Sequence, residues 1–303
     1  MSRYAIHPDF EPYASTKVLL SPWLLPMLQK LMELMLARTP VPEGICVRKE
    51  TAYGRVPLTV FAPKDLAAPA PCLVYFHGGA FALKATPSPQ QLVCHYAKEA
   101  APRVLLVVYR LQPRHPFPAG LDDSRDAYRW VLENAAALGV DPARVAVGGD
   151  SAGGALAAGV CLAARDAGLP LPCFQLLVYP AADARMESAS MARYPDTPLW
   201  NSRLNGKMWR MYLKNGDAGQ RGYASPLEAA SFAGLPPAYV EVAEFDCLHD
   251  EGLALAAALE AAGVPVERSE TRGTIHGYDQ ALDSAVTRAN VCRRVAALRR
   301  AFQ

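Results

Sequence analysis

The sequence lacks an excess of charge of either sign. Its 31 lysines and arginines nearly balance 29 aspartates and glutamates, and the formal net charge is +2. A protein that binds nucleic acid needs a basic surface to neutralise phosphates, and no cluster of lysine and arginine provides one here. We therefore expect no nucleic-acid partner.

Long apolar runs are missing as well. The most apolar stretch, residues 18–36, is interrupted by Pro22 and Pro26 and carries Lys30 and Glu33. A bilayer span needs about 20 uninterrupted apolar residues. The N-terminus also lacks a basic stretch followed by an apolar core and a small-residue cleavage site. These absences predict a cytoplasmic protein without an integral membrane span.

Cysteine and histidine are few and irregularly placed. The seven cysteines are an odd number, widely spread, and none of them forms a C-x-x-C pair. They are typical of free core thiols in a reducing compartment. The six histidines show no ligand spacing such as H-E-x-x-H, so we expect no metal and no other cofactor.

What the sequence does contain is a glycine-flanked serine, in the stretch Gly149-Asp150-Ser151-Ala152-Gly153. A short β-branched run precedes it and a helix-forming run of small residues follows, which is the context of a nucleophile elbow. The turn is so tight that Gly149 and Gly153 must lack side chains, and the Ser151 hydroxyl then points out at the top of a sheet. The free N–H groups of the following helix point at the serine and stabilise negative charge there. We predict that Ser151 is a nucleophile.

Strand and helix patterns alternate around this elbow. Continuous apolar or alternating runs predict strands at residues 46–53, 56–61, 72–76, 104–109, 144–149, 174–179, 238–244 and 266–271. Helical patterns lie between most of them, and a terminal helix follows residue 278. This order predicts an α/β fold with a mostly parallel, doubly wound sheet.

Two segments fall outside the alternation and divide the chain. Residues 1–44 carry an apolar stripe at helical spacing, and residues 181–224 are rich in Arg, Met, Tyr and Trp without a strand pattern. We predict that both segments form a cap over a core made of residues 45–180 and 225–303. The stripe in the first segment fits a cap or core helix better than a membrane-surface helix, because its polar face has few basic residues.

A serine hydroxyl needs a base to remove its proton, and the base needs an acid to hold its tautomer. In α/β hydrolases the chain order is serine, acid, histidine. His276 follows the last strand, and Asp246 follows the strand at 238–244. Glu244 and Asp250 compete for the acid role, but Glu244 lies on the strand and Asp250 is better explained as a helix N-cap. We therefore predict His276 as the base and Asp246 as the acid.

Ester chemistry also needs donors for an oxyanion. His77-Gly78-Gly79-Ala80 follows the strand at 72–76, where α/β hydrolases place an H-G-G-G loop. We predict that the backbone N–H groups of Gly78 and Gly79, with that of Ala152 at the elbow, form the oxyanion hole.

Taken together, these motifs resemble the hormone-sensitive-lipase-like family, the bacterial family IV carboxylesterases of the α/β-hydrolase fold. The matching motifs are His77-Gly78-Gly79, Tyr109-Arg110-Leu111, His115-Pro116-Phe117-Pro118-Ala119, Gly149-Asp150-Ser151-Ala152-Gly153-Gly154, Gly234-Leu235-Pro236-Pro237, Asp246-Cys247-Leu248-His249-Asp250-Glu251-Gly252 and His276-Gly277-Tyr278. The resemblance implies the α/β-hydrolase fold with a helical cap, the roles given above for Ser151, His276 and Asp246, and the same three oxyanion donors. It also implies activity on short- and medium-chain acyl esters.

The sequence departs from the family pattern at two positions. Ala80 replaces the third glycine of H-G-G-G, which bears on the local backbone and the room in the pocket. Gln112 stands where the family usually has alanine, and we expect it to be neutral. Asp123 and Glu251 lie within family motifs, and we expect them to be structural.

The function predicted from these residues is a serine carboxylesterase that acts on a small-molecule ester. One alternative is a deacetylase of an acetylated carbohydrate or other small-molecule ester, in which aromatic side chains of the 181–224 segment stack on a sugar; these are Trp200, Trp209, Tyr212 and Tyr223. The simpler interpretation makes them cap core. An alternative from another functional class is a non-catalytic ligand-binding protein with a hydrolase fold. Such proteins usually lack the nucleophile or the base, whereas this sequence keeps candidates for both. Monomer and homodimer both remain open.

Overall fold

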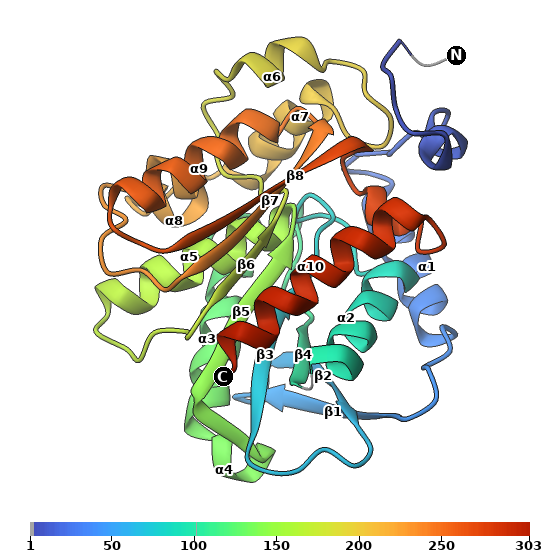
Figure 1. The fold of residues 1–303 in the computed structure, drawn as a ribbon. Coiled ribbons are helices and arrows are strands. Elements are labelled where there is room, and N and C mark those ends of the chain that lie inside the picture. Colours follow the sequence, from blue (N-terminus) through green and yellow to red (C-terminus); the bar gives the residue numbers. More distant parts are fainter. Residues whose placement is uncertain (1–2, 101) are drawn as a thin grey trace.

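A single eight-stranded sheet forms the centre of the molecule, with strand order β1-β2-β4-β3-β5-β6-β7-β8 (Figure 1). The computed structural model describes residues 3–100 and 102–303. The strands are β1 (Ile45–Ala52), β2 (Val56–Pro63), β3 (Ala70–Phe76), β4 (Arg103–Val107), β5 (Val140–Asp150), β6 (Gln175–Val178), β7 (Ala238–Phe245) and β8 (Val266–Ile275). β1 and β2 form the predicted hairpin, β2 also runs antiparallel to β4, and the other neighbours are parallel. The predicted α/β fold is therefore confirmed.

The helices cover both faces of the sheet. They are α1 (Leu25–Ala37), α2 (Pro87–Ala100), α3 (Ala119–Glu133), α4 (Ala135–Leu138), α5 (Ala152–Asp166), α6 (Ala189–Arg193), α7 (Ser202–Tyr212), α8 (Arg221–Ala224), α9 (His249–Ala261) and α10 (Ala285–Ala301). Figure 1 shows α2 and α10 together on one face, with α3, α5 and α9 on the other.

The sequence of β3 explains why both faces must be covered. Side chains alternate along a strand, so Leu73 and Tyr75 point to one face while Val74 and Phe76 point to the other. All four are buried, the first pair in an apolar cluster with α2 and α10, the second pair in a cluster with α3, α5 and α9. A strand that is apolar on both faces belongs in a parallel sheet between two helical layers.

The segment 181–224 contains α6, α7 and α8 and no strand, as predicted. Figure 1 shows α6 and α7 at one end of the sheet. Two buried or half-buried carboxylates attach this segment to the core. Glu251 accepts hydrogen bonds from the amides of Ala182 (2.7 Å) and Asp183 (3.2 Å), and Asp250 accepts one from Ser190 (2.8 Å).

The contact of Asp250 corrects one expectation from the sequence. α9 begins at His249, and its N-cap residue is Leu248, with no side-chain capping bond. Asp250 therefore lies inside the first turn, where its carboxylate binds the start of α6 instead of capping its own helix. The sequence around Asp250 fits a capping motif, but it does not show that the amide of Ser190, from another segment, binds the Asp250 carboxylate instead.

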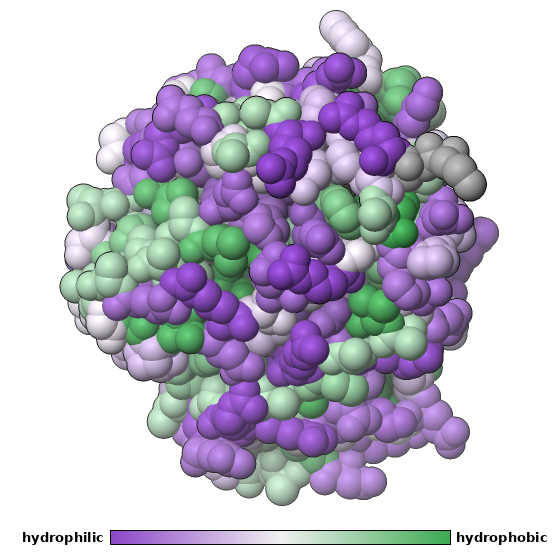
Figure 2. All heavy atoms as spheres, turned by 45° about the horizontal axis from the view of Figure 1, so that its top comes forward, coloured by the Kyte–Doolittle hydropathy of each residue, from purple (hydrophilic) through white to green (hydrophobic). Residues whose placement is uncertain are grey.

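The N-terminal helix α1 differs from the expectation in its burial. Leu25 and Met32 are buried, but the rest of the predicted apolar stripe is half-buried or exposed. Trp23 is 92% exposed and Met27 70%, and further exposed apolar side chains are Leu19, Leu24, Leu31, Leu34 and Met35. The molecular surface in Figure 2 is a mosaic of hydrophilic and hydrophobic residues. None of the helices among the described residues combines the length and apolar character needed to cross a bilayer.

The cysteines carry no disulfide among the described residues. Cys72, Cys94, Cys161 and Cys247 are buried and Cys173 is half-buried, in agreement with the prediction of core thiols. The other two cysteines, Cys46 on β1 and Cys292 on α10, are exposed, so the expectation of a core position is wrong for this pair.

Candidate active site

The turn between β5 and α5 holds Ser151 at the end of β5. Ser151 has φ +55°, a conformation that costs energy for a residue with a side chain and that is typical of functional turns. Close packing of the turn against the end of β3 explains the two glycines. A Cβ atom on Gly149 would lie 2.4 Å from the carbonyl oxygen of Phe76, and one on Gly153 would lie 1.9 Å from the same atom. The predicted elbow geometry is therefore present.

Three predicted side chains meet at this turn. The Nε2 atom of His276 lies 2.9 Å from the Oγ atom of Ser151, and its Nδ1 atom lies 2.6 Å from an Asp246 carboxylate oxygen. Asp246 is fully buried and its other oxygen accepts the amide of Leu248 at 2.9 Å. The side chains form one hydrogen-bonded chain from a buried carboxylate to an accessible hydroxyl.

The two competing acids lie elsewhere. Glu244 accepts the amide of Gly273 at 2.7 Å, and Asp250 binds α6 as described above. Neither carboxylate is a hydrogen-bond partner of His276. The structure thus brings Asp246 to His276, as the position after β7 indicated.

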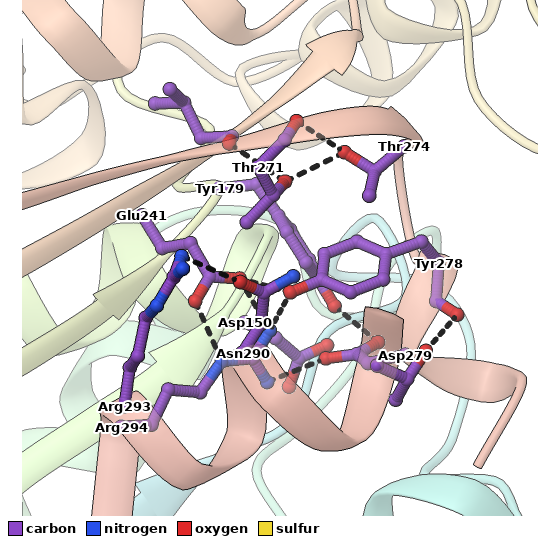
Figure 3. Close-up of polar contacts among 12 residues, drawn as sticks. Asp150, Tyr179, Glu241, Thr271, Thr274, Tyr278, Asp279, Asn290, Arg293 and Arg294 are labelled. Atoms are coloured by element: carbon purple, nitrogen blue, oxygen red, sulfur yellow. Dashed lines mark hydrogen bonds and ion pairs between the residues drawn. The ribbon is translucent and has the colours of Figure 1, made fainter. Parts of the chain in front are cut away.

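An irregularity in β8 directs His276 to this position. The register between β7 and β8 shifts after Ala243, and the hydroxyls of Thr271 and Thr274 lie 2.6 Å apart at the irregularity (Figure 3). Thr271 also donates to the carbonyl oxygen of Val242 at 3.0 Å. These bonds satisfy buried polar groups that the shifted ladder leaves without partners.

Aromatic rings pack against His276. The ring centroid of Tyr179 lies 4.7 Å from that of His276 in an edge-on arrangement, and that of Trp200 lies at 6.0 Å. Both rings are buried. They restrict the imidazole to the orientation in which it bridges Asp246 and Ser151.

The loop after β3 lies beside the serine. A Cβ on Gly78 would lie 2.2 Å from the Asp150 carboxylate, so the Gly78 backbone packs closely against that side chain. Gly79 (φ +110°) and Ala80 (φ +60°) turn the chain, and no acceptor within the described part of the chain receives their amides. The amide of Ala152 lies in the first turn of α5, where N–H groups have no carbonyl partner within the helix.

Gln112 contacts this loop, which the sequence did not predict. Its side chain is fully buried and donates to the carbonyl oxygen of Ala80 at 2.6 Å. Gln29 of α1 donates to the carbonyl oxygens of Ala82 (2.7 Å) and Gln112 (3.2 Å). The expectation that Gln112 is neutral is wrong, because this residue holds the backbone at the position where alanine replaces the family's glycine.

Asp150 is a half-buried carboxyl beside the nucleophile. Burial raises its pKa from 3.8 to about 6, and the negative charge of Asp279 adds to the rise. Tyr75 opposes the rise by donating a hydrogen bond of 3.0 Å. The ionised form is therefore less favourable in the folded protein than in the unfolded chain.

Replacing Asp150 should remove part of the pH dependence of stability. Because its folded-state pKa lies above the unfolded value, the stabilising contribution of the protonated carboxyl is present below about pH 4 and is lost as the pH rises through about 6. The shift corresponds to roughly 3 kcal/mol. In urea unfolding between pH 4 and 7, the wild type should lose that much more stability than Asp150→Asn. The exposed Asp65→Asn should follow the wild type, and parallel curves for wild type and Asp150→Asn would contradict the expectation.

A cavity opens in front of Ser151 and His276. Its volume is about 220 Å³. Both segments outside the sheet-forming core contribute to its largely apolar wall, with Val18 and Met32 from the N-terminal segment and Leu199 and Trp200 from the 181–224 segment. Further lining residues are Gly78, Gly79, Ala80, Leu83, Pro89, Leu92, Asp150, Tyr179 and Asp279.

The other aromatic residues of the 181–224 segment are placed differently. Trp209 and Tyr212 are buried, and Tyr212 stacks on Phe81 with ring centroids 3.8 Å apart. Tyr223 is half-buried and donates to Asp166 at 2.8 Å. These three side chains pack within the protein, and Trp200 alone of the four named in the sequence analysis lines the cavity. No group of His, Cys, Asp and Glu within residues 3–100 and 102–303 has the arrangement of a metal site.

Comparisons with known proteins support the fold and a carboxylic ester hydrolase. A family model described as alpha/beta hydrolase fold matches residues 73–280. The chain is 39% identical to "Carboxylesterase NlhH" of Mycobacterium tuberculosis over 251 residues, which are 82% of this chain and 79% of that protein. It is 35% identical to "Ethyl acetate hydrolase" of Pseudomonas putida over 228 residues, 74% of this chain and 71% of that protein. Among solved structures, "Bacterial Heroin Esterase" superposes with a TM-score of 0.89 at 35% identity and covers 99% of this chain and 98% of its own.

Proposed function

The chain belongs to the hormone-sensitive-lipase-like family of α/β-hydrolase-fold carboxylic ester hydrolases, and from this premise we propose that it is a serine carboxylesterase acting on short- to medium-chain acyl esters. The observation that carries the proposal is the hydrogen-bonded chain from Asp246 through His276 to Ser151. That arrangement of nucleophile, base and orienting acid is the one used for acyl transfer on several unrelated folds.

In the proposed reaction, His276 takes the Ser151 proton at Nε2 while Oγ attacks the ester carbonyl carbon. The tetrahedral intermediate collapses, and the alcohol leaves with the proton that His276 returns. Water then attacks the acyl-enzyme with His276 again as base, and His276 returns the proton to Ser151 Oγ as the bond to the acyl carbon breaks and the carboxylic acid is released. Asp246 keeps the Nδ1 proton in place and stabilises the imidazolium that forms on His276.

We assign the oxyanion hole to the amides of Gly78, Gly79 and Ala152, the three donors expected from the sequence. Gly78 and Gly79 line the cavity in front of Ser151, which supports the assignment. Removing one such donor typically costs about 3–4 kcal/mol of transition-state stabilisation.

The cap is part of the proposal. Residues 1–44 and 181–224 supply Val18, Met32, Leu199 and Trp200 to the cavity wall, which supports their role as a cap. Residues 45–180 and 225–303 then form the hydrolase core. A dry, apolar wall strengthens the electrostatic interactions at Ser151 because it excludes water.

The size of the cavity supports the chain-length range. Its volume of about 220 Å³ lies below the roughly 300–1,000 Å³ of pockets for drug-sized ligands. A short acyl group and a small alcohol fill such a space. Of the four aromatic residues that favoured a carbohydrate substrate, Trp200 alone lines the cavity, so the stacking surface expected for an acetylated sugar is reduced to one ring, and we favour the general esterase.

A series of p-nitrophenyl acyl esters tests the proposal. We expect kcat/KM to be highest for acetyl to hexanoyl esters and to fall by at least about tenfold for dodecanoyl, since each misplaced methylene costs on the order of 1 kcal/mol. Leu92→Ala removes part of the cavity wall, so the variant should also hydrolyse esters with longer acyl chains. Leu171→Ala, at an exposed site away from the cavity, should not change the acyl-chain preference. Equal activity on all chain lengths, or none on any ester, would contradict the proposal.

A further inference from the structure

A buried ionic cluster lies behind the candidate site, and the reaction described above does not use it. Its centre is Arg294 of α10, whose side chain is fully buried. A guanidinium has N–H donors at all three nitrogens, and in Arg294 every nitrogen is paired (Figure 3). Nε and Nη2 bind Glu241 at 3.0 and 2.5 Å, and Nη1 binds Asp279 at 2.7 Å. Tyr96 and Tyr278 accept the remaining bonds at 3.2 and 3.1 Å.

Hydroxyl donors complete the pairing of the two carboxylates. Tyr278 and Tyr239 donate to Glu241 at 2.7 and 3.0 Å. Tyr179 donates to Asp279 at 2.6 Å. Apolar residues of similar volume often stabilise a fold as well as such a buried ionic group does.

One arm of the cluster reaches His276 through Tyr179. The Tyr179 hydroxyl is held by Asp279, while its backbone amide donates to the carbonyl oxygen of Glu241 at 2.7 Å. Tyr179 itself has φ +34°, so its backbone has an unusual conformation that these contacts maintain. Its ring packs edge-on against the His276 imidazole at 4.7 Å. The cluster therefore fixes both ends of the residue that contacts His276.

We propose that Asp279, anchored by Arg294, is a positioning residue that holds Tyr179 against His276 and so keeps the imidazole aligned between Asp246 and Ser151. The inference rests on the proposed function, in which His276 is the base. Asp279 follows His276 by three residues in the short helix Tyr278–Gln280, so its bond to Arg294 also fixes the loop that carries His276. Because the imidazole is held on both sides, it spends less time in orientations in which Nε2 does not face Ser151.

The test compares three variants in the full-length protein. Asp279→Asn keeps the size of the side chain but removes its charge, and Tyr179→Phe keeps the ring but removes the hydroxyl that Asp279 holds. Tyr96→Phe is the matched control, because it also removes a buried hydroxyl bonded to Arg294, but on α2 and not on the residue that contacts His276. The readouts are kcat and KM on p-nitrophenyl acetate and the low-field proton resonance of the His276 Nδ1–H bonded to Asp246.

We expect Asp279→Asn and Tyr179→Phe to lower kcat by about tenfold, with KM changed by less than about twofold, because misalignment affects the reacting geometry more than binding. The His276 resonance should move or broaden in both variants. Tyr96→Phe should keep the wild-type kcat and resonance even if its melting temperature falls. If Asp279→Asn does not fold, Tyr179→Phe still decides the question.

Two results would overturn the inference. One is wild-type kcat and an unmoved resonance in Tyr179→Phe, and the other is an equal loss of kcat in Tyr96→Phe, which would make the cluster purely structural. His276→Ala, assayed alongside, separates this failure from a failure of the proposed function. An inactive His276→Ala with a fully active Tyr179→Phe contradicts the positioning role alone, whereas an active His276→Ala contradicts the proposed function itself.

Discussion

Ser151→Ala should lower kcat for p-nitrophenyl acetate hydrolysis by at least about 10⁴-fold. The substitution removes the Oγ atom that lies 2.9 Å from His276 Nε2, and no other hydroxyl is hydrogen-bonded to this histidine within the described part of the chain. The amides at the oxyanion hole and the apolar cavity remain, so a small residual rate above that in water should persist. Without the hydroxyl no acyl-enzyme forms.

Two further variants make this expectation specific. His276→Ala should reduce kcat by a similar factor, and Ser151→Ala/His276→Ala should be no worse than either single variant, because the side chains act as a unit. Ser231→Ala, at an exposed loop position, is the matched serine control and should retain the wild-type rate. A wild-type rate in a folded Ser151→Ala protein would be incompatible with the proposed reaction.

Arg294→Met should destabilise the protein by about 3–5 kcal/mol. The methionine fills most of the arginine's volume, but it leaves Glu241 and Asp279 buried without a cation. The desolvation of both carboxylates is then no longer offset by attraction to the guanidinium, and five hydrogen bonds are lost with it. This is the largest stability effect that we expect from a single substitution outside the apolar core.

Urea unfolding at neutral pH measures this effect, and the same helix provides its control. Arg299 of α10 pairs with Glu99 at 3.5 Å, but both side chains are largely exposed. Arg299→Met should therefore cost less than about 1 kcal/mol. An Arg294→Met protein within about 1 kcal/mol of the wild type would show that the buried cluster is dispensable for stability.

The elbow and the central sheet could be predicted from the sequence because their signals are local. Tight packing at the β5–α5 turn requires glycine on both sides of Ser151, so the requirement is visible in neighbouring residues. Side chains along each inner strand point alternately to two buried faces of the sheet. The strands are therefore continuous apolar runs in the sequence. The positions of Asp246 and His276 followed from chain order, because the carboxyl ends of neighbouring parallel strands meet at one edge of the sheet.

What escaped prediction depends on contacts between distant segments. Gln112 binds Ala80 across 32 residues, and Arg294 binds Glu241 across 53, so no local pattern reports either pair. The exposure of α1 is of the same kind, since an apolar stripe reveals a tendency to be buried but not whether a neighbouring element covers it. The close approach of the Gly78 backbone to the Asp150 carboxylate likewise becomes visible only when the two loops are adjacent.

Covalent labelling shows whether Ser151 is the residue that forms the acyl-enzyme. The protein is reacted with a p-nitrophenyl organophosphate, which traps an activated serine, and its peptides are weighed by mass spectrometry. We expect a single adduct on the peptide that contains Ser151, formed in parallel with loss of esterase activity and absent from Ser151→Ala. An adduct on another residue that accompanies inactivation, or full inactivation without modification of Ser151, would contradict it.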